Sequence, residues 1–338
     1  MTAITISDQE YREITQYFFE ELPKVDYEQL GFRERLWYSK AHVWYSMITQ
    51  DFLGLYKHAS RWVTLFDQNP EMIASHPIFY LKANNYLLES LLLLRHPERF
   101  RQTIETLKDQ INSDYFPQNT NTKALAFLYL GNNRLNLHFL QGDFRDGLTI
   151  IDELFQGIEK YKHQIDDHHI MMLYYKIASM CFGAGEYNRC IDYLKPVIEN
   201  RSLSMREDLL CFSRVLNIFA HYEAGFDYHL ESHLRETYKF LIKMNDLHEV
   251  QKAMIRFVRG LGEIYPHELK TAFENLYKEL LQYENDPYER RSFLYLDILS
   301  WLESKIDNVP IAQVIRDKAA TLNRKERSSI SPLSPDLK

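Results

Sequence analysis

The stretch Lys176-Ile-Ala-Ser-Met-Cys-Phe-Gly-Ala-Gly-Glu-Tyr-Asn-Arg-Cys-Ile191 contains a helix-like run that stops at Gly185-Glu-Tyr and then resumes. The same break, a glycine followed closely by an aromatic residue, occurs at Gly142 and at Gly225. Successive glycines of this kind lie 43 and 40 positions apart. A repeat of this length, built from two helices and a tight turn, is typical of an α-solenoid. The sequence therefore predicts an all-α, right-handed solenoid with a period of about 40 residues.

Composition favours long helices over strands. Glycine supplies only 11 of the 338 residues and proline another 11, so the chain has few residues for the many tight turns of a β fold. Hydrophobic residues make up 45% of the chain, which is enough for a packed core and excludes wholesale disorder.

Apolar residues at helical spacing outline a short helix within residues 1–30, ended by Pro23, and about seven antiparallel helix pairs after it. The expected pairs are 33–49 with 52–66, 78–94 with 99–111, the segments 123–165, 167–200 and 206–244, then 247–264 with 267–284 and 288–306 with 310–324. The longest loop is expected at Asn112–Thr122. We predict one continuous helical-repeat domain over residues 1–325 and a disordered Ser/Pro tail over 326–338.

The turn motifs resemble the tetratricopeptide repeat. In that family, a small residue on each helix lets the two helices of a pair approach, and the aromatic residue of the turn fills their junction. The Gly185 unit matches best, with Ala178 and Cys190 at the two small positions. The Gly142 unit has Leu135 at the first of these positions, and the repeat is longer than the family's 34 or so residues. The resemblance thus implies a tetratricopeptide-like array with longer helices.

Three further blocks, 79–95, 134–144 and 206–217, look like a family of uncharacterised bacterial helical-repeat proteins. The resemblance covers about residues 27 to 265 and implies a bacterial, all-helical repeat protein. Members of that family are often longer at the N-terminus, so this chain can be a shortened form. The resemblance implies no activity.

Charge and cysteine content indicate the class of partner and the compartment. The net charge is −7, whereas a dedicated nucleic-acid binder usually carries a basic excess. The N-terminus lacks a basic segment followed by an apolar run, and no apolar stretch is long enough to span a membrane. The three cysteines, Cys181, Cys190 and Cys211, fit reduced core thiols. We expect a cytoplasmic protein that binds neither nucleic acid nor membrane.

Two histidine clusters are candidate metal sites. His163, His168 and His169 lie near Asp166 and Asp167, and His229 and His233 are spaced for one helical face. The alternative is that Asp166 or Asp167 caps a helix beginning near His168. The pair His229 and His233 lacks the residue order of a metalloprotease and a third ligand. We expect no metal, no cofactor and no catalytic residues.

A binding surface has better support. In helical-repeat arrays the first helix of each pair lines the concave face. Asparagine side chains can bond an extended peptide through both a donor and an acceptor, and aromatic rings supply rigid contact area. Counting back from the glycine turns, the predicted binding residues are Tyr129, Asn132, Asn136, Met172, Tyr175 and Ser179, and Phe212, Val215 and Phe219 are expected to follow. Asn85 and Arg95 occupy comparable places earlier in the chain and complete the predicted set. The alternative is that these aromatics pack between units while the asparagines only cap or solvate.

These features predict a non-enzymatic scaffold that binds a protein or peptide in its concave face. A peptide-sensing regulator resembling bacterial pheromone receptors is the first alternative, although residues 1–30 cannot supply a DNA-binding domain. A metal-dependent enzyme using His163, His168 and His169 is the second alternative. The identity of the ligand does not follow from the sequence.

Overall fold

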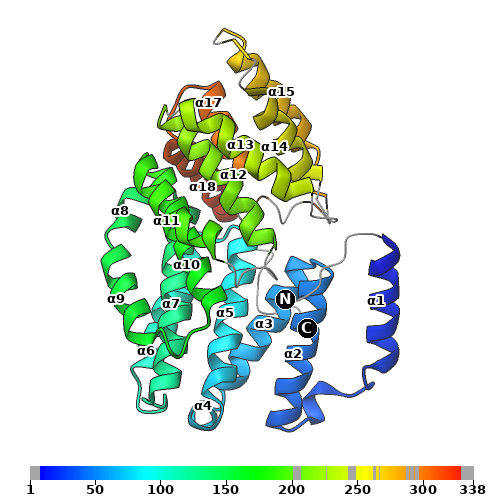
Figure 1. Ribbon diagram of the computed structural model, residues 1–338. Coiled ribbons are helices and arrows are strands. Elements are labelled where there is room, and N and C mark those ends of the chain that lie inside the picture. Colours follow the sequence, from blue (N-terminus) through cyan, green and yellow to red (C-terminus); the bar gives the residue numbers. More distant parts are fainter. Residues whose placement is uncertain are drawn as a thin grey trace. The chain divides into compact units, whose positions relative to one another are not determined.

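The computed structural model describes residues 8–200, 207–225, 227–242, 249–261, 264–265, 267–286, 289, 293 and 297–328. Within these ranges the chain consists of helices joined by turns, and they contain no strand (Figure 1). The all-α prediction is therefore confirmed. Among the helices of these ranges, none is both long enough and apolar enough to cross a membrane.

The chain divides into two compact units. Unit 1 comprises Met1–Leu94, Glu98–Arg134 and Gln156–Asp166, and unit 2 comprises Arg95–Pro97, Leu135–Phe155 and Asp167–Lys338. The prediction of one continuous domain over residues 1–325 stays a prediction.

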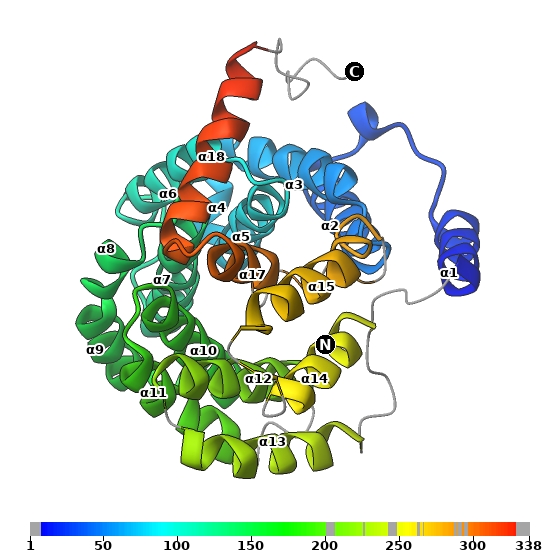
Figure 2. The ribbon, with the colours of Figure 1, turned by 90° about the horizontal axis from the view of Figure 1, so that it is seen from above.

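Unit 1 begins with α1 (Asp8–Glu21) and the short 3-10 helix η1 (Tyr27–Gln29). The pair α2 (Phe32–Ile48) and α3 (Phe52–Asp67) follows, then α4 (Met72–Ser75), α5 (Pro77–Leu93) and α6 (Pro97–Ile111). Helix α3 packs against both α2 and α5 (Figure 2). The predicted helices in this part of the chain are confirmed. Helix α4 is an additional short helix that was not predicted.

Helices α7 (Thr120–Gln141) and α9 (Ile151–Tyr161) contribute residues to both units. Unit 2 also contains α8 (Phe144–Leu148), α10 (Asp167–Gly183), α11 (Tyr187–Glu199), α12 (Glu207–Glu223), α13 (Asp227–Ile242), α14 (Glu249–Gly260), α15 (Leu269–Leu281), α17 (Ile298–Ile306) and α18 (Ile311–Ser328). Helix α11 packs against both α10 and α12.

Two boundaries differ from the prediction. The helix expected after Gly142 is two helices, α8 and α9, because the Thr149 N–H bonds to the Asp146 carbonyl three residues back, at 3.1 Å, and the α-helical bonding is interrupted there. Helix α18 continues through Ser328, so the first residues of the predicted tail are helical, and residues 329–338 lie outside the described ranges. Most of the segment predicted as helical before Asp297 also lies outside them.

The helix pairs share one turn geometry. Gly142, Gly185 and Gly225 all have left-handed backbone angles, with φ of 68°, 81° and 72°. Gln50, Arg95 and Asn308 adopt the same conformation in turns that lack glycine, with φ of 56°, 55° and 53°. The residue after the left-handed one donates its N–H to the carbonyl five residues back, as in the Schellman motif. These bonds join Asp51 to Ser46, Asp143 to His138, Glu186 to Cys181 and Val309 to Ser304, at 2.8 to 3.1 Å.

The shared turn also occurs on the N-terminal side of the glycine turns. Turn residues 50, 95, 142, 185 and 225 lie 45, 47, 43 and 40 positions apart. Because a non-glycine residue with positive φ is uncommon, the left-handed angles of Gln50 and Arg95 at this spacing indicate that the turn recurs without depending on glycine.

Small residues permit close helix contacts in unit 2. Ala178 and Cys190, the two small positions of the Gly185 unit, are fully buried. A Cβ on Gly183 would lie 2.4 Å from the ring of Phe144, the aromatic residue of the Gly142 turn. Phe144 therefore occupies the space that a side chain at residue 183 would need.

A buried histidine of α2, His42, faces a half-buried one of α3, His58, in unit 1. The rings of His42 and His58 lie 4.5 Å apart, and His42 also packs against Phe18 of α1 and Tyr38. Burial, followed by the charges of His42, Arg61 and Lys57, lowers the pKa of His58 to about 3. Burial also lowers the pKa of His42. Both rings are therefore neutral near pH 7.

Acidification is expected to destabilise unit 1. An unfolded histidine has a pKa of about 6.5, so between pH 6.5 and about 3 the unfolded chain binds more protons at residue 58 than the folded chain. Stability therefore falls as the pH falls, and His58 accounts for a loss of about 1 kcal/mol between about pH 7.5 and about pH 5.5. Urea denaturation at both pH values measures this loss. The His58→Phe variant should lose about 1 kcal/mol less than the wild type over this interval; an identical loss would contradict the assignment.

Candidate binding surface

The left-handed turn residues fix one face on the first helix of each pair. Tyr129, Asn132 and Asn136 precede Gly142 by 13, 10 and 6 positions, and these spacings place them on one side of α7. Met172, Tyr175 and Ser179 precede Gly185 by the same intervals. We call the residues at these three positions of a helix a face row.

Applying the same intervals to Gln50 and Arg95 adds two face rows in unit 1. The row on α2 consists of Trp37, Lys40 and Trp44, and the row on α5 consists of Lys82, Asn85 and Glu89. Of these six residues, only Asn85 was predicted from the sequence as a binding residue. The others could not be placed, because Gln50 and Arg95 do not reveal a left-handed turn by residue type.

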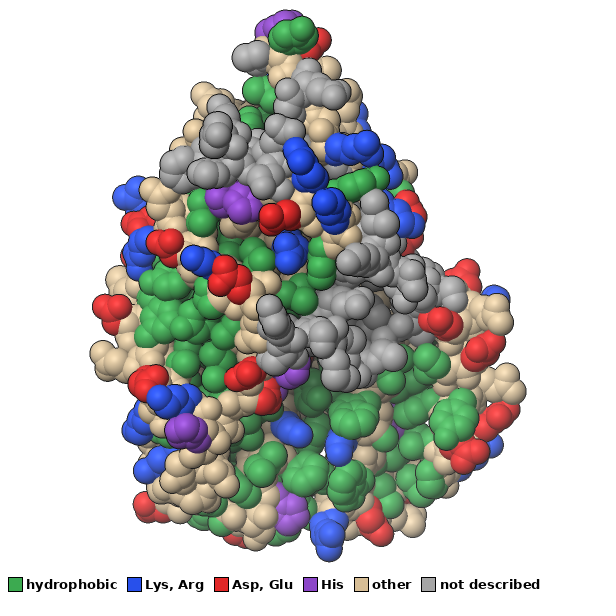
Figure 3. Space-filling view, viewed as in Figure 1, with side chains coloured by type: hydrophobic (Ala, Val, Ile, Leu, Met, Phe, Trp, Pro, Cys, Tyr) green, Lys and Arg blue, Asp and Glu red, His purple; other side chains and the backbone are tan. Residues whose placement is uncertain are grey.

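The α2 row exposes two tryptophan rings of unit 1. Trp37 is 51% exposed and Trp44 is 47% exposed. The Lys40 ammonium lies between them, 4.3 Å from the centroid of the Trp37 ring and 4.9 Å from that of the Trp44 ring. The ring of Phe79 on α5 lies 5.4 Å from that of Trp37. Figure 3 shows hydrophobic side chains interspersed with basic ones over α2 and α5.

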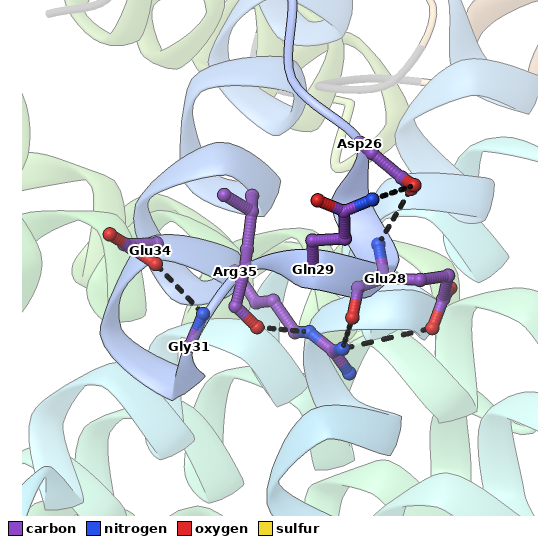
Figure 4. Close-up of polar contacts among 7 residues, drawn as sticks. Asp26, Glu28, Gln29, Gly31, Glu34 and Arg35 are labelled. Atoms are coloured by element: carbon purple, nitrogen blue, oxygen red, sulfur yellow. Dashed lines mark hydrogen bonds and ion pairs between the residues drawn. The ribbon is translucent and has the colours of Figure 1, made fainter.

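Hydrogen bonds between α2 and the segment before it fix the start of α2, the helix that carries this face row. Gly31 donates its backbone N–H to the Glu34 carboxylate at 2.8 Å, which caps the start of α2 (Figure 4). The Arg35 guanidinium turns back to donate to the carbonyls of Leu30 and Glu28, at 2.8 and 2.6 Å. Asp26 accepts from the backbone N–H of Glu28 at 3.1 Å. The first turn of α2 is thus tied to residues 26–31 on the side where the chain enters.

The α5 row adds a second cation close to the first. Lys82 is near enough to Lys40 that its charge contributes, after burial, to lowering the pKa of Lys40. In the part of the chain that the structure describes, neither lysine makes a hydrogen bond or an ion pair with a carboxylate. The α2 and α5 rows therefore combine exposed rings with two lysines that no carboxylate among the described residues neutralises.

Asn133, which was not predicted, joins two predicted residues. Its buried amide donates to the Asn85 side-chain oxygen at 3.0 Å and to the Tyr129 carbonyl at 2.9 Å. Burial, with smaller contributions from Tyr86 and Glu89, raises the pKa of Tyr129 to about 12, so its hydroxyl stays protonated. Asn132 is half-buried beside this group on α7. The adjacent asparagine pairs 84–85 and 132–133 were the available sequence signal for this contact.

The face-row residues that belong to unit 2 are buried or half-buried. Asn136 is buried and accepts a hydrogen bond from the Lys176 ammonium at 2.5 Å. Tyr175 is only 2% exposed, so the expectation that its ring projects is wrong. Ser179 donates to the Tyr175 carbonyl at 2.9 Å, and Met172 is half-buried.

Phe212, Val215 and Phe219, which were also expected to project, lie in the core of unit 2. The Phe219 ring is fully buried, with its centroid 4.4 Å from that of Trp301 on α17. Helix α17 thus contacts the α12 row at Phe219. The prediction for these three residues is wrong, because it took no account of helices later in the chain packing on this face.

Arg95 does not belong to a face row. Helix α5 ends at Leu93, and Arg95 is the left-handed turn residue itself. Its side chain is half-buried, and its backbone conformation defines the register of the α5 row.

The histidine clusters do not converge on a metal-like arrangement. Among the described residues, no group of three or more His, Cys, Asp or Glu side chains could hold a metal ion. Helix α10 begins at Asp167, directly after Asp166, as the capping alternative requires. The His229 side chain lies outside the described residues. The three cysteines are buried free thiols, and burial raises the pKa of Cys181 to about 11.

No protein-family model matches the chain, and the search of curated proteins finds no match either.

Proposed function

We propose that this chain is a non-enzymatic, cytoplasmic binding protein whose helix pairs stack as a right-handed, tetratricopeptide-like solenoid. In this proposal the first helices of the pairs line the concave face, which binds an extended peptide or a segment of a partner protein. The recurrent left-handed turns support the repeat, because they give successive first helices the same register.

The observation that carries the proposal is the exposure of Trp37 and Trp44 on one face of α2. Burying one such ring against a partner removes a large apolar area from water at a small cost in side-chain entropy. Tryptophan is also among the residues most enriched at the energetic centres of interfaces. The corresponding residues of α12 are buried, and Trp301 of α17 packs against one of them, Phe219, which supports this face of a helix pair as one that can hold another segment.

Loss of the two indoles is expected to abolish peptide binding. Random peptides displayed on phage are selected against the full-length protein, and the selected peptides are titrated by fluorescence polarisation. The double variant Trp37→Ala/Trp44→Ala should bind them at least about tenfold more weakly, since each ring contributes an anchor of about 1 kcal/mol or more.

The matched control is Tyr115→Ala, because Tyr115 is 47% exposed but lies between α6 and α7, outside the face rows. It should bind like the wild type. The proposal fails if no peptide is selected, or if the double variant binds the selected peptides as tightly as the control does.

A further inference from the structure

The α2 and α5 rows also indicate the chemistry of the occupant. We infer that this surface, formed by Trp37, Lys40, Trp44, Phe79 and Lys82, binds an acidic peptide segment that presents a carboxylate between two apolar side chains. The inference rests on the proposed function and adds the class of ligand to it.

The first argument is charge. Lys40 lies over the rings of Trp37, Trp44 and Phe79, the charge of Lys82 on α5 acts on it, and no carboxylate is bonded to either lysine within the described residues. Cations that are partly withdrawn from water and repel each other are stabilised by an anion placed between them. The rings alone offset only part of this cost, since a cation over an exposed ring gains little. A ligand carboxylate would complete the site.

The second argument is spacing. Trp37 and Trp44 are seven residues apart on α2, which corresponds to about 10 Å along the helix axis. Lys40 lies between them. A peptide that matches this row needs apolar side chains about 10 Å apart with an acidic side chain between them, which about three residues of extended chain can span.

The third argument separates a peptide from a nucleic acid, which also offers anions and stacking surfaces. Glu89 belongs to the same α5 row as Lys82, and its negative charge contributes to raising the pKa values of Tyr86 and Tyr129. A continuous polyanion following this row would be repelled there, whereas a peptide with one or two carboxylates would not. The net charge of −7 adds to the repulsion at long range.

Fluorescence polarisation with the full chain tests this inference. The probes are three labelled peptides of about ten residues, identical except that two central positions flanked by phenylalanines are glutamate, glutamine or lysine. The glutamate peptide should bind at least about tenfold more tightly than the other two. Its affinity should fall as the salt concentration rises from about 50 to about 300 mM.

The charge-removing variant is Lys40→Gln/Lys82→Gln, and the matched control is Lys108→Gln/Lys123→Gln, whose lysines are exposed on α6 and α7 of unit 1. The first variant should lose at least about tenfold in affinity for the glutamate peptide at an unchanged melting temperature, and the control should lose little. Equal binding of the glutamate and glutamine peptides, or an unaffected charge-removing variant, overturns the inference.

Two further outcomes are distinguishable. An oligothymidylate probe that binds more tightly than the glutamate peptide, through Lys40 and Lys82, would make nucleic acid the occupant and overturn the inference. Selected non-acidic peptides that lose affinity on Trp37→Ala/Trp44→Ala would reject the acidic class while supporting the proposed function. If no peptide binds at all, both proposals fail.

Discussion

Replacing Gly142 by alanine is expected to lower the free energy of unfolding of unit 2 by about 3 kcal/mol, whereas Gly185→Ala should cost only about 1 kcal/mol. Both glycines have left-handed backbone angles, with φ of 68° and 81°, so both substitutions carry the cost of placing a side chain in this conformation.

The difference between them comes from α18. A Cβ on Gly142 would lie 2.8 Å from the Ala312 carbonyl oxygen and 3.1 Å from the Arg316 backbone nitrogen, whereas nothing lies within 4 Å of a Cβ on Gly185. Backbone atoms of a helix cannot move singly, so α18 must shift as a body and weaken the bond from the Arg316 guanidinium to the Gly142 carbonyl, at 3.3 Å. Overpacking of this kind typically costs about 1–3 kcal/mol.

Urea denaturation of both variants measures the difference, and far-ultraviolet circular dichroism verifies that both remain helical. Equal destabilisation by Gly142→Ala and Gly185→Ala would show that α18 does not rest on the Gly142 turn in solution. The pair of variants thus tests a contact between residues 174 positions apart in the sequence.

Replacing Glu223 by alanine is expected to cost about 3 kcal/mol of stability in unit 2. The side chain of this residue, the last of α12, is 9% exposed, and its carboxylate accepts from the Trp301 indole N–H at 2.9 Å and from the Lys305 ammonium at 2.5 Å. Alanine would leave the indole N–H without its acceptor and the Lys305 ammonium without its counter-charge. Removing one partner of a buried pair is costly for this reason.

Two further variants identify the source of the loss. Glu223→Gln keeps an acceptor for the indole N–H but removes the charge, so it should be destabilised by about half as much. Glu186→Ala removes a carboxylate from an exposed pair with Arg189 and should cost less than about 1 kcal/mol. Thermal or urea denaturation compares the three, and equal losses for Glu223→Ala and Glu186→Ala would be incompatible with a buried pair.

Local signals explain which elements were predictable. The boundaries of α2, α3, α5 and α6 follow from apolar periodicity interrupted at Gln50-Asp51 and before Pro97, because such residues stop or start a helix wherever they occur. The break between α8 and α9 was missed, because Thr149–Ile150 carries no glycine or proline to mark it.

The candidate surface was only partly predictable. The intervals counted from the glycine turns correctly placed Tyr129, Asn132 and Asn136 on one side of α7. They could not reach Trp37, Lys40 and Trp44, because the left-handed angle of Gln50 comes from its place in the fold and not from its residue type. Once the left-handed angle of Gln50 is known, counting back 13, 10 and 6 positions from it locates the α2 row.

The sequence by itself therefore determined an all-helical chain whose helices are separated at glycine turns, because helix periodicity and glycine turns are local properties. Only the tertiary structure decided which face rows remain exposed to solvent. Trp37 and Trp44 remain exposed on α2, whereas Phe219 on α12 is covered by Trp301, which lies 82 positions later in the sequence. Exposure depends on which distant helices pack on a face, and no local pattern within a helix contains that information.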